Sequence, residues 1–188
     1  MADGFGKYAV DATADSMYCY PGTAVLRNRF GLEDAAKLKE LETDISAIRQ
    51  NDLLMNPIKG KFSATHLCAI HKYLLEDVYP FAGHYRREDI AKGTTRFLPH
   101  GEVKHEVSGK LKQLADEKWL AGLPFDEYIE RASYYFAELN YIHPFREGNG
   151  RALREFMRQL FIYGGYEVNW GAVPTETLLD AMIESVFD

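Results

Sequence analysis

Apolar residues recur along most of this chain at the spacing of helices. From about residue 33 to residue 50, and again from about 103 to 120, apolar residues stand at every third or fourth position with charged residues between them. A stripe with that period lines one face of a helix. Ser63 could cap another such run, which Pro80 closes. The pattern therefore predicts amphipathic helices packed around a common core.

Three further helices are predicted in the second half of the chain. One begins after Pro124, and the next stops at Gly164-Gly165, a pair that suits a left-handed C-terminal cap. A last short helix is expected over residues 174–187, with Thr175 as its candidate cap. All three runs have the apolar spacing of helices that bury one face.

Two stretches do not follow the helical period. Residues 1–22 are rich in Asp, Gly, Ala and Tyr, and we expect an irregular arm that ends in a turn and lies over the domain. Residues 81–103 carry three glycines and a proline around the short run Thr94–Leu98. Such punctuation predicts a loop and a small β-hairpin.

The composition is that of one compact globular domain. The chain has 188 residues, of which 46% are hydrophobic and 27% charged. Its net charge of -6 argues against a surface that binds nucleic acid along its length. Cys19 and Cys68 lack metal-ligand spacing, so we expect unpaired thiols. We see no signal peptide and no run of about 18 apolar residues, and therefore expect a cytosolic protein without a membrane span.

The candidate chemistry is concentrated in the loop His143-Pro-Phe-Arg-Glu-Gly-Asn-Gly-Arg151. Pro144 disfavours helical geometry at the residue before it, so the preceding helix should end at His143. An imidazole has an ordinary pKa of about 6.5 and exchanges protons easily near neutral pH, which makes His143 the candidate general base. Phe145 is expected to anchor the loop to the helical core.

The second half of the loop predicts a cradle for a nucleotide. The segment Gly148-Asn149-Gly150 stands directly before a helix, where backbone N–H groups can converge on a phosphate. Arg151 and Arg154 could both reach the oxygens of one polyphosphate. Glu147 offers a carboxylate beside them, and Mg²⁺ needs only one or two when phosphates complete its shell. The sequence thus predicts a site for a nucleotide with Mg²⁺.

Each of these features has an ordinary explanation when it stands alone, as a turn, a hydrogen-bonding histidine or a solvated arginine. Together, residues 143–154 match the signature His-Pro-Phe-x-(Asp or Glu)-Gly-Asn-Gly-Arg-x-x-Arg, and in this the chain resembles the Fic family. Residues 79–88, with Ile90–Thr95 after them, are similar to the segment that leads into the flap hairpin of that family. The resemblance covers about residues 60–170.

The resemblance implies both a fold and an activity. The fold is the all-α, mainly helical Fic fold with a small β-hairpin flap. The activity is the transfer of AMP from ATP to a Ser, Thr or Tyr hydroxyl of a target protein. His143 would deprotonate that hydroxyl, and Glu147 would hold Mg²⁺. The phosphates would be bound by Gly148, Asn149, Gly150, Arg151 and Arg154.

The flap is expected to dock the target protein. An extended segment of the target would pair with it by strand addition, which would bring the hydroxyl over His143. An ordinary surface hairpin is the alternative. The predicted docking residues are Lys92, Gly93, Thr94, Thr95, Arg96, Phe97 and Leu98.

Control of the site is expected to come from another chain. Many Fic proteins carry an inhibitory helix with the pattern (Ser or Thr)-x-x-x-Glu-(Gly or Asn), whose glutamate pairs with the second motif arginine. No Ser or Thr of this chain fits that pattern. Residues 18–31 resemble a segment of bacterial Fic toxins that a separate small antitoxin inhibits. The resemblance implies a toxin whose Arg154 is neutralised by a partner's glutamate, with type II topoisomerases as candidate targets.

Several alternatives stay open. The segment that resembles the toxins also occurs in bacterial effectors secreted into host cells. The loop could serve a transferase with another donor, of UMP, GMP or phosphocholine, although the kinase-like subgroup replaces the pair Gly150-Arg151. A nucleotide-binding regulator without transfer is a further alternative, but binding alone does not require His143. We expect an arm and helix over residues 1–59, a catalytic domain over 60–170 and a helical extension over 171–188.

Overall fold

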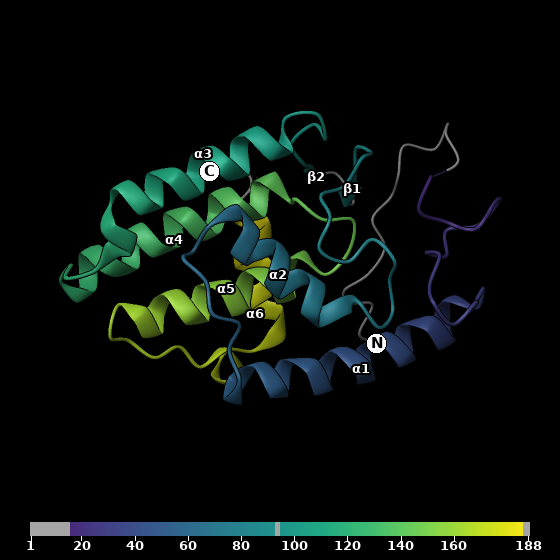
Figure 1. Cartoon of the computed structure of the whole chain (residues 1–188), viewed down its shortest axis with the longest axis horizontal. Coiled ribbons are helices and arrows are strands. Elements are labelled where there is room, and N and C mark those ends of the chain that lie inside the picture. Colours follow the sequence, from purple (N-terminus) through teal and green to yellow (C-terminus); the bar gives the residue numbers. More distant parts are fainter. Residues whose placement is uncertain (1–15, 93–94, 186–188) are drawn as a thin grey trace.

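Six helices make up most of the computed structural model, which describes residues 16–92 and 95–185. They are α1 (Ala35–Met55), α2 (Ala64–Leu75), α3 (Val103–Asp116), α4 (Phe125–Ile142), α5 (Asn149–Tyr163) and α6 (Thr175–Glu184). Strands β1 (Ala91–Lys92) and β2 (Thr95–Arg96) form an antiparallel hairpin, and short 3-10 turns cover Lys118–Leu120 and Trp170–Ala172. The predicted mainly helical fold with a small β-hairpin is confirmed (Figure 1).

Helix α5 lies at the centre of the helices and packs against both α2 and α4 (Figure 1). Helix α3 packs on α4, and α1 packs on α2. The core is built from side chains without exposed surface, among them Leu67 of α2, Leu139 of α4 and Phe156 of α5. Burying a side chain of this size contributes about 1.5–3 kcal/mol. The two helices that flank the His143 loop are therefore firmly packed.

The apolar stripe predicted for α1 is only partly right. Asp34 caps the helix by accepting two backbone N–H bonds of the first turn, and the helix continues to Met55 instead of ending near residue 50. Ile48, which the stripe included, is 69% exposed, whereas Ser46 is 2% exposed. The reason is that part of the inner face of α1 is polar, because it meets a charged side chain of α5.

The other helix ends follow the predicted signals with three exceptions. Helix α2 ends at Leu75 and not at Pro80, because the chain turns there and the N–H groups of Val78 and Tyr79 both donate to the carbonyl oxygen of Leu75. Ser63 caps α2, and Gly165, with φ 86°, follows the end of α5. The helix predicted over residues 103–120 stops at Asp116. The reason is that Lys118, Trp119 and Leu120 have positive φ angles of 54°, 53° and 63°. Helix α6 begins at Thr175 itself, so that residue is not its cap.

The N-terminal arm lies over the domain from residue 16 onward, as predicted; residues 1–15 are outside the described part. The ring of Tyr18 meets Phe81 edge-on, with 5.2 Å between the ring centroids. An antiparallel bridge joins Cys19 to Leu26 and closes the turn at the end of the arm. The thiols of Cys19 and Cys68 are unpaired, as expected.

The C-terminal helix is attached close to the end of α4. Nδ2 of Asn140 donates to the carbonyl oxygen of Met182 at 2.6 Å. Within residues 16–92 and 95–185, no helix is long and apolar enough to cross a membrane. The division of the chain at residues 59 and 170 stays a prediction.

Candidate active site

The loop between α4 and α5 is bracketed by two residues with left-handed backbone. His143 has φ 47° and ψ 63°, and Gly148 has φ 78°. A non-glycine residue adopts this region only where the surrounding contacts hold it there. A side chain at Gly148 is disfavoured by this backbone conformation, and it would also clash, because its Cβ would lie 2.2 Å from Cδ1 of Leu75. Helix α4 therefore ends at His143, as predicted, and the chain turns directly into α5.

His143 is held in its neutral form. The residue is 5% exposed, and its Nδ1 lies 3.1 Å from the carbonyl oxygen of Asn140. A carbonyl can only accept, so Nδ1 carries the proton and Nε2 carries the basic lone pair. The ring stacks on Phe97 of the flap, with 3.8 Å between centroids and 19° between planes. Burial lowers its pKa to about 3, and the charges of Arg86 and Lys92 act in the same direction.

Phe145 anchors the loop in the core, as predicted. It has no exposed surface and stacks on the imidazole of His71, with 3.7 Å between centroids. The side chain of Asn149 closes the loop from the other end: Oδ1 accepts the backbone N–H of Phe145 at 2.8 Å, and Nδ2 donates to its carbonyl oxygen at 2.7 Å. The side-chain amide of Asn149 is thus used within the loop. The predicted contact of its backbone N–H with phosphate stays a prediction.

His71 of α2 supports the same loop through hydrogen bonds of both its ring nitrogens. Its Nδ1 accepts the backbone N–H of Gly83 at 2.8 Å. Its Nε2 therefore carries the proton, which it donates to the carbonyl oxygen of Glu147 at 2.8 Å. Burial lowers the pKa of His71 to about 3. A neutral imidazole with one fixed tautomer thus joins α2 to the centre of the motif.

The start of α5 has the geometry of an anion site. No side chain of the described residues caps this helix, so its first turn leaves N–H donors that can face an anion. Arg154 folds back over Gly150, where a Cβ would lie 3.1 Å from Nη1 of the arginine. Binding of phosphate by Gly148-Asn149-Gly150 remains a prediction, and the backbone geometry is compatible with it.

Glu147 is the residue that could hold a metal ion. Its side chain is 15% exposed, and Oε1 accepts the backbone N–H of Gly148 at 2.9 Å. Burial and the nearby carboxylate of Glu42 raise its pKa, against the effect of Arg151. No group of three metal-ligating side chains gathers in the part of the chain that is described. One carboxylate completed by nucleotide oxygens and water is a donor set that suits Mg²⁺.

The two motif arginines have different surroundings. Arg151 reaches to α1, where Nη1 donates to the hydroxyl of Ser46 at 2.9 Å and Nη2 donates to the carboxylate of Glu42. The guanidinium of Arg154 has no hydrogen-bond or ionic partner among the described residues, and burial together with Arg151 lowers its pKa. Arg154 therefore has donors to offer a ligand, whereas Arg151 is already engaged.

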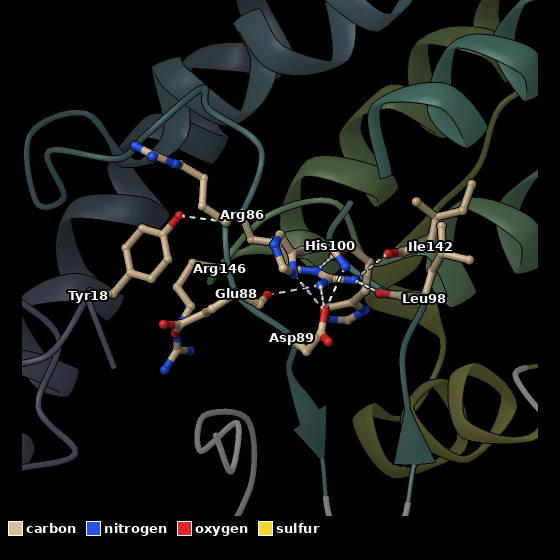
Figure 2. A network of polar contacts seen from close by, with 10 residues as sticks. Tyr18, Arg86, Glu88, Asp89, Leu98, His100, Ile142 and Arg146 are labelled. Atoms are coloured by element: carbon tan, nitrogen blue, oxygen red, sulfur yellow. Dashed lines mark hydrogen bonds and ion pairs between the residues drawn. The ribbon is translucent and has the colours of Figure 1, made fainter. Parts of the chain in front are cut away.

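Arg86 is a buried cation that joins the flap to the loop that begins at His143 (Figure 2). It is 2% exposed, and its guanidinium donates to four backbone carbonyl oxygens. Two belong to the flap segment, those of Glu88 at 3.0 Å and Leu98; two belong to the end of α4, those of Ile142 at 3.2 Å and His143 at 2.8 Å. These bonds replace the water that a buried charge has lost.

Acidic side chains hold the start of the flap segment. Glu88 accepts from Nε of Arg146 at 2.9 Å and from the hydroxyl of Ser16 at 2.7 Å. Asp89 accepts the backbone N–H of His100 at 2.7 Å. The N-terminal arm, the flap segment and the motif loop are thus joined through one polar network, most of which Figure 2 shows.

The structure brings the flap next to His143, the predicted base. Phe97 stacks on His143, while Arg96 is exposed. Docking of a target segment on this hairpin stays a prediction. The predicted flap residues that are described are Lys92, Thr95, Arg96, Phe97 and Leu98, and the other two, Gly93 and Thr94, lie outside the described residues.

Sequence reasoning missed the residues that support the loop from outside it. Arg86 lies within the stretch that is similar to the Fic flap segment, so a signal was present without a role attached to it. His71 and Glu42 lie in periodic helical runs, where only the apolar positions were singled out. A buried polar residue on an amphipathic helix gives no local pattern that separates it from a solvated one.

The fold and the loop together define a Fic domain. Residues 61–161 match the model of the Fic/DOC family. The chain belongs to that family, as the resemblance of its motif indicated.

Relatives of known classification support this assignment. The chain is 41% identical over 170 residues to the protein adenylyltransferase VbhT of Bartonella schoenbuchensis, a match that covers 90% of this chain and 36% of that protein. It is 35% identical to the probable protein adenylyltransferase Fic of Salmonella typhimurium, over 94% of this chain and 84% of that protein. The chain thus spans about a third of the length of VbhT but most of the second relative.

A solved structure agrees with the fold. BepC of Bartonella tribocorum, with bound AMPPNP, superposes with a TM-score of 0.81 and 29% sequence identity, over 90% of this chain and 88% of that chain. Its ligand is an analogue of the nucleotide that the motif predicts.

Replacement of Arg86 by Lys should detach the flap from the loop. An ammonium group keeps the charge but cannot reach four carbonyl oxygens at once. We expect R86K to lower the free energy of unfolding by about 3 kcal/mol, measured by urea denaturation. Arg87 is exposed and provides the matched control, since R87K should change stability by less than about 0.5 kcal/mol. Equal losses in the two variants would contradict this role of Arg86.

The lowered pKa of His143 should make folding depend on pH. Between its unfolded pKa of about 6.5 and its folded pKa of about 3, the unfolded chain binds a proton that the folded chain does not. Stability is therefore full above about pH 6.5 and declines as the pH falls. From about pH 7 to about pH 5, the wild type should lose about 2 kcal/mol more than H143A. The exposed His105 provides the control, and a pH dependence that H143A and H105A change alike would contradict this expectation.

Proposed function

We propose that this chain is a protein adenylyltransferase, which transfers AMP from ATP to a Ser, Thr or Tyr hydroxyl of a target protein. The observation that carries the proposal is the state of His143: a buried, neutral imidazole with its basic lone pair at Nε2, at the other end of a short loop from the anion site of α5. The classification of the relatives points to the same activity.

The proposed step is a displacement at the α-phosphorus of ATP. The target hydroxyl oxygen forms a bond to that phosphorus while its proton passes to Nε2 of His143. The bond from the α-phosphorus to the oxygen that bridges it to the β-phosphate breaks, and pyrophosphate leaves. A well-placed general base contributes about 10²–10⁴ in rate, and the remainder would come from positioning and charge stabilisation.

The residues at the start of α5 would hold the nucleotide. The backbone N–H groups of Gly148-Asn149-Gly150 and the guanidinium of Arg154 would bind the phosphates, with Arg151 as a further predicted contact. Glu147 would hold Mg²⁺, which when bound offsets the negative charge of the phosphates. The flap would pair with an extended segment of the target, because Phe97 of the flap stacks directly on the proposed base.

A transfer experiment tests this activity. A lysate incubated with the protein and ATP should yield a target peptide with the added mass of AMP by mass spectrometry. The addition should disappear with H143A and persist with H105A, whose position is exposed on α3. Labelled UTP, GTP and CDP-choline run in parallel would detect another donor. A wild-type protein that modifies nothing with any of these donors would contradict the proposed activity.

We also infer that a partner protein controls the site by placing a glutamate against Arg154. This guanidinium has no partner in the described part of the chain, and its burial would make a carboxylate there a strong ligand. Such a partner fits a toxin held by a small antitoxin in the bacterial cytoplasm, with topoisomerases as first candidate targets. Delivery into a host cell is the other setting.

Purification from the native host tests the partner. We expect a small protein to accompany the chain, and addition of that protein to suppress AMP transfer. Replacement of its key glutamate by alanine should restore transfer. An isolated chain that is inert toward ATP, with no small protein accompanying it, would rule this control out.

A further inference from the structure

A helix outside the motif loop holds the first motif arginine. On α1, Glu42 accepts Nη2 of Arg151 with Oε1 and the hydroxyl of Tyr79 with Oε2, the latter at 2.6 Å. Ser46, one turn further on, accepts Nη1 of the arginine at 2.9 Å. The side chains of Glu42 and Arg151 are 14% and 19% exposed. Both oxygens of Glu42 are therefore engaged, in surroundings where little water screens the pair.

Glu147 lies within reach of the same arginine but is not hydrogen-bonded to it. Its Oε1 is 3.6 Å from Nη2 of Arg151, which is longer than a hydrogen bond. That oxygen instead accepts the backbone N–H of Gly148 at 2.9 Å. No residue of the described ranges hydrogen-bonds to Oε2 of Glu147. Arg151 is therefore hydrogen-bonded to α1 and not to Glu147, and Oε2 of Glu147 is available to a ligand.

The geometry points to Glu42 as a positioning residue: we propose that it draws Arg151 onto α1 and so leaves the carboxylate of Glu147 to a divalent cation. This inference rests on the proposed role of Glu147 in the nucleotide site. Arg151 stands four residues after Glu147, the spacing at which side chains of one turn meet. Without Glu42, Glu147 is the nearest carboxylate to Arg151, and a buried charge without a partner is costly. The ion pair of Arg151 with Glu147 would then shorten from 3.6 Å to a direct hydrogen bond, and the cation would have to compete with a guanidinium.

A purely structural role for Glu42 makes a different prediction. If it only fastened α1 to α5, its loss would weaken all nucleotide binding or the fold, with or without Mg²⁺. If it holds Arg151 away from Glu147, its loss would reduce only the gain in affinity that Mg²⁺ brings. The replacement E42Q keeps the size of the side chain and an acceptor oxygen but removes the charge, so it separates the two roles.

The readout is the ratio of two dissociation constants for ATP, one measured in EDTA and one in Mg²⁺, by titration calorimetry of the intact chain. We expect E42Q to lower this ratio about tenfold, the scale on which partners of metal ligands act. The double variant E42Q/R151Q should recover the wild-type ratio, even if ATP binds more weakly overall, because no guanidinium remains to close onto Glu147. Glu40 lies on the exposed side of α1, so E40Q should leave the ratio unchanged.

Two results would overturn the inference: a wild-type ratio in E42Q, or a reduced ratio that E42Q/R151Q does not recover. If E42Q fails to fold, E42D takes its place: its shorter side chain holds Arg151 less closely, so the ratio should again fall, and E42D/R151Q should recover it. A wild type that binds ATP equally well with and without Mg²⁺ would remove the metal role of Glu147, and this inference with it. A wild type without AMP transfer but with an intact ratio would count against the proposed function alone.

Discussion

The buried guanidinium of Arg86 constrains much of this candidate active site. An ion removed from water needs a full set of hydrogen-bond partners, and here all the close ones are backbone carbonyl oxygens. Carbonyl oxygens are fixed to the chain, so their convergence fixes the path of the segments that carry them. The flap segment and the end of α4 are therefore held at a set distance, and the stack of Phe97 on His143 follows from it.

The charges of the site are arranged around two imidazoles that stay neutral. Both are buried; His143 has its Nδ1 hydrogen-bonded to a backbone carbonyl oxygen, and His71 has both ring nitrogens hydrogen-bonded to backbone groups. Apart from Arg86 and Lys92, which lie near His143, four charged groups gather at the other end of the loop: Glu42, Glu147, Arg151 and Arg154. Two carboxylates and two guanidinium groups nearly cancel. A site of this kind favours a ligand that brings both phosphate and a cation over a bare anion.

The sequence predicted the elements whose causes are local. Periodicity located the helices, Ser63 and Gly165 marked ends of α2 and α5, and Pro144 indicated where α4 stops. The motif residues were also found, because they are contiguous. The left-handed turn that ends α3 at Asp116 was not predicted, since no glycine or proline marks it.

The supports of the loop could not be predicted in the same way. Glu42 is 109 residues from Arg151 along the chain, and Arg86 is 57 residues from His143. Contacts at such separations depend on how the helices pack, and a polar residue on a helix has the same local pattern whether it faces solvent or a buried charge. For this reason the pattern of α1 did not indicate that Ile48 is exposed and Ser46 is buried.

His143, with its left-handed backbone, both ends α4 and is the proposed base. The backbone torsions that stop the helix also aim the imidazole, so the direction of the proton acceptor is set by the chain path and not by a choice among rotamers alone. Any change that lets α4 continue by one residue would swing the ring out of its stack with Phe97. The chemistry of this loop and the length of its preceding helix cannot vary independently.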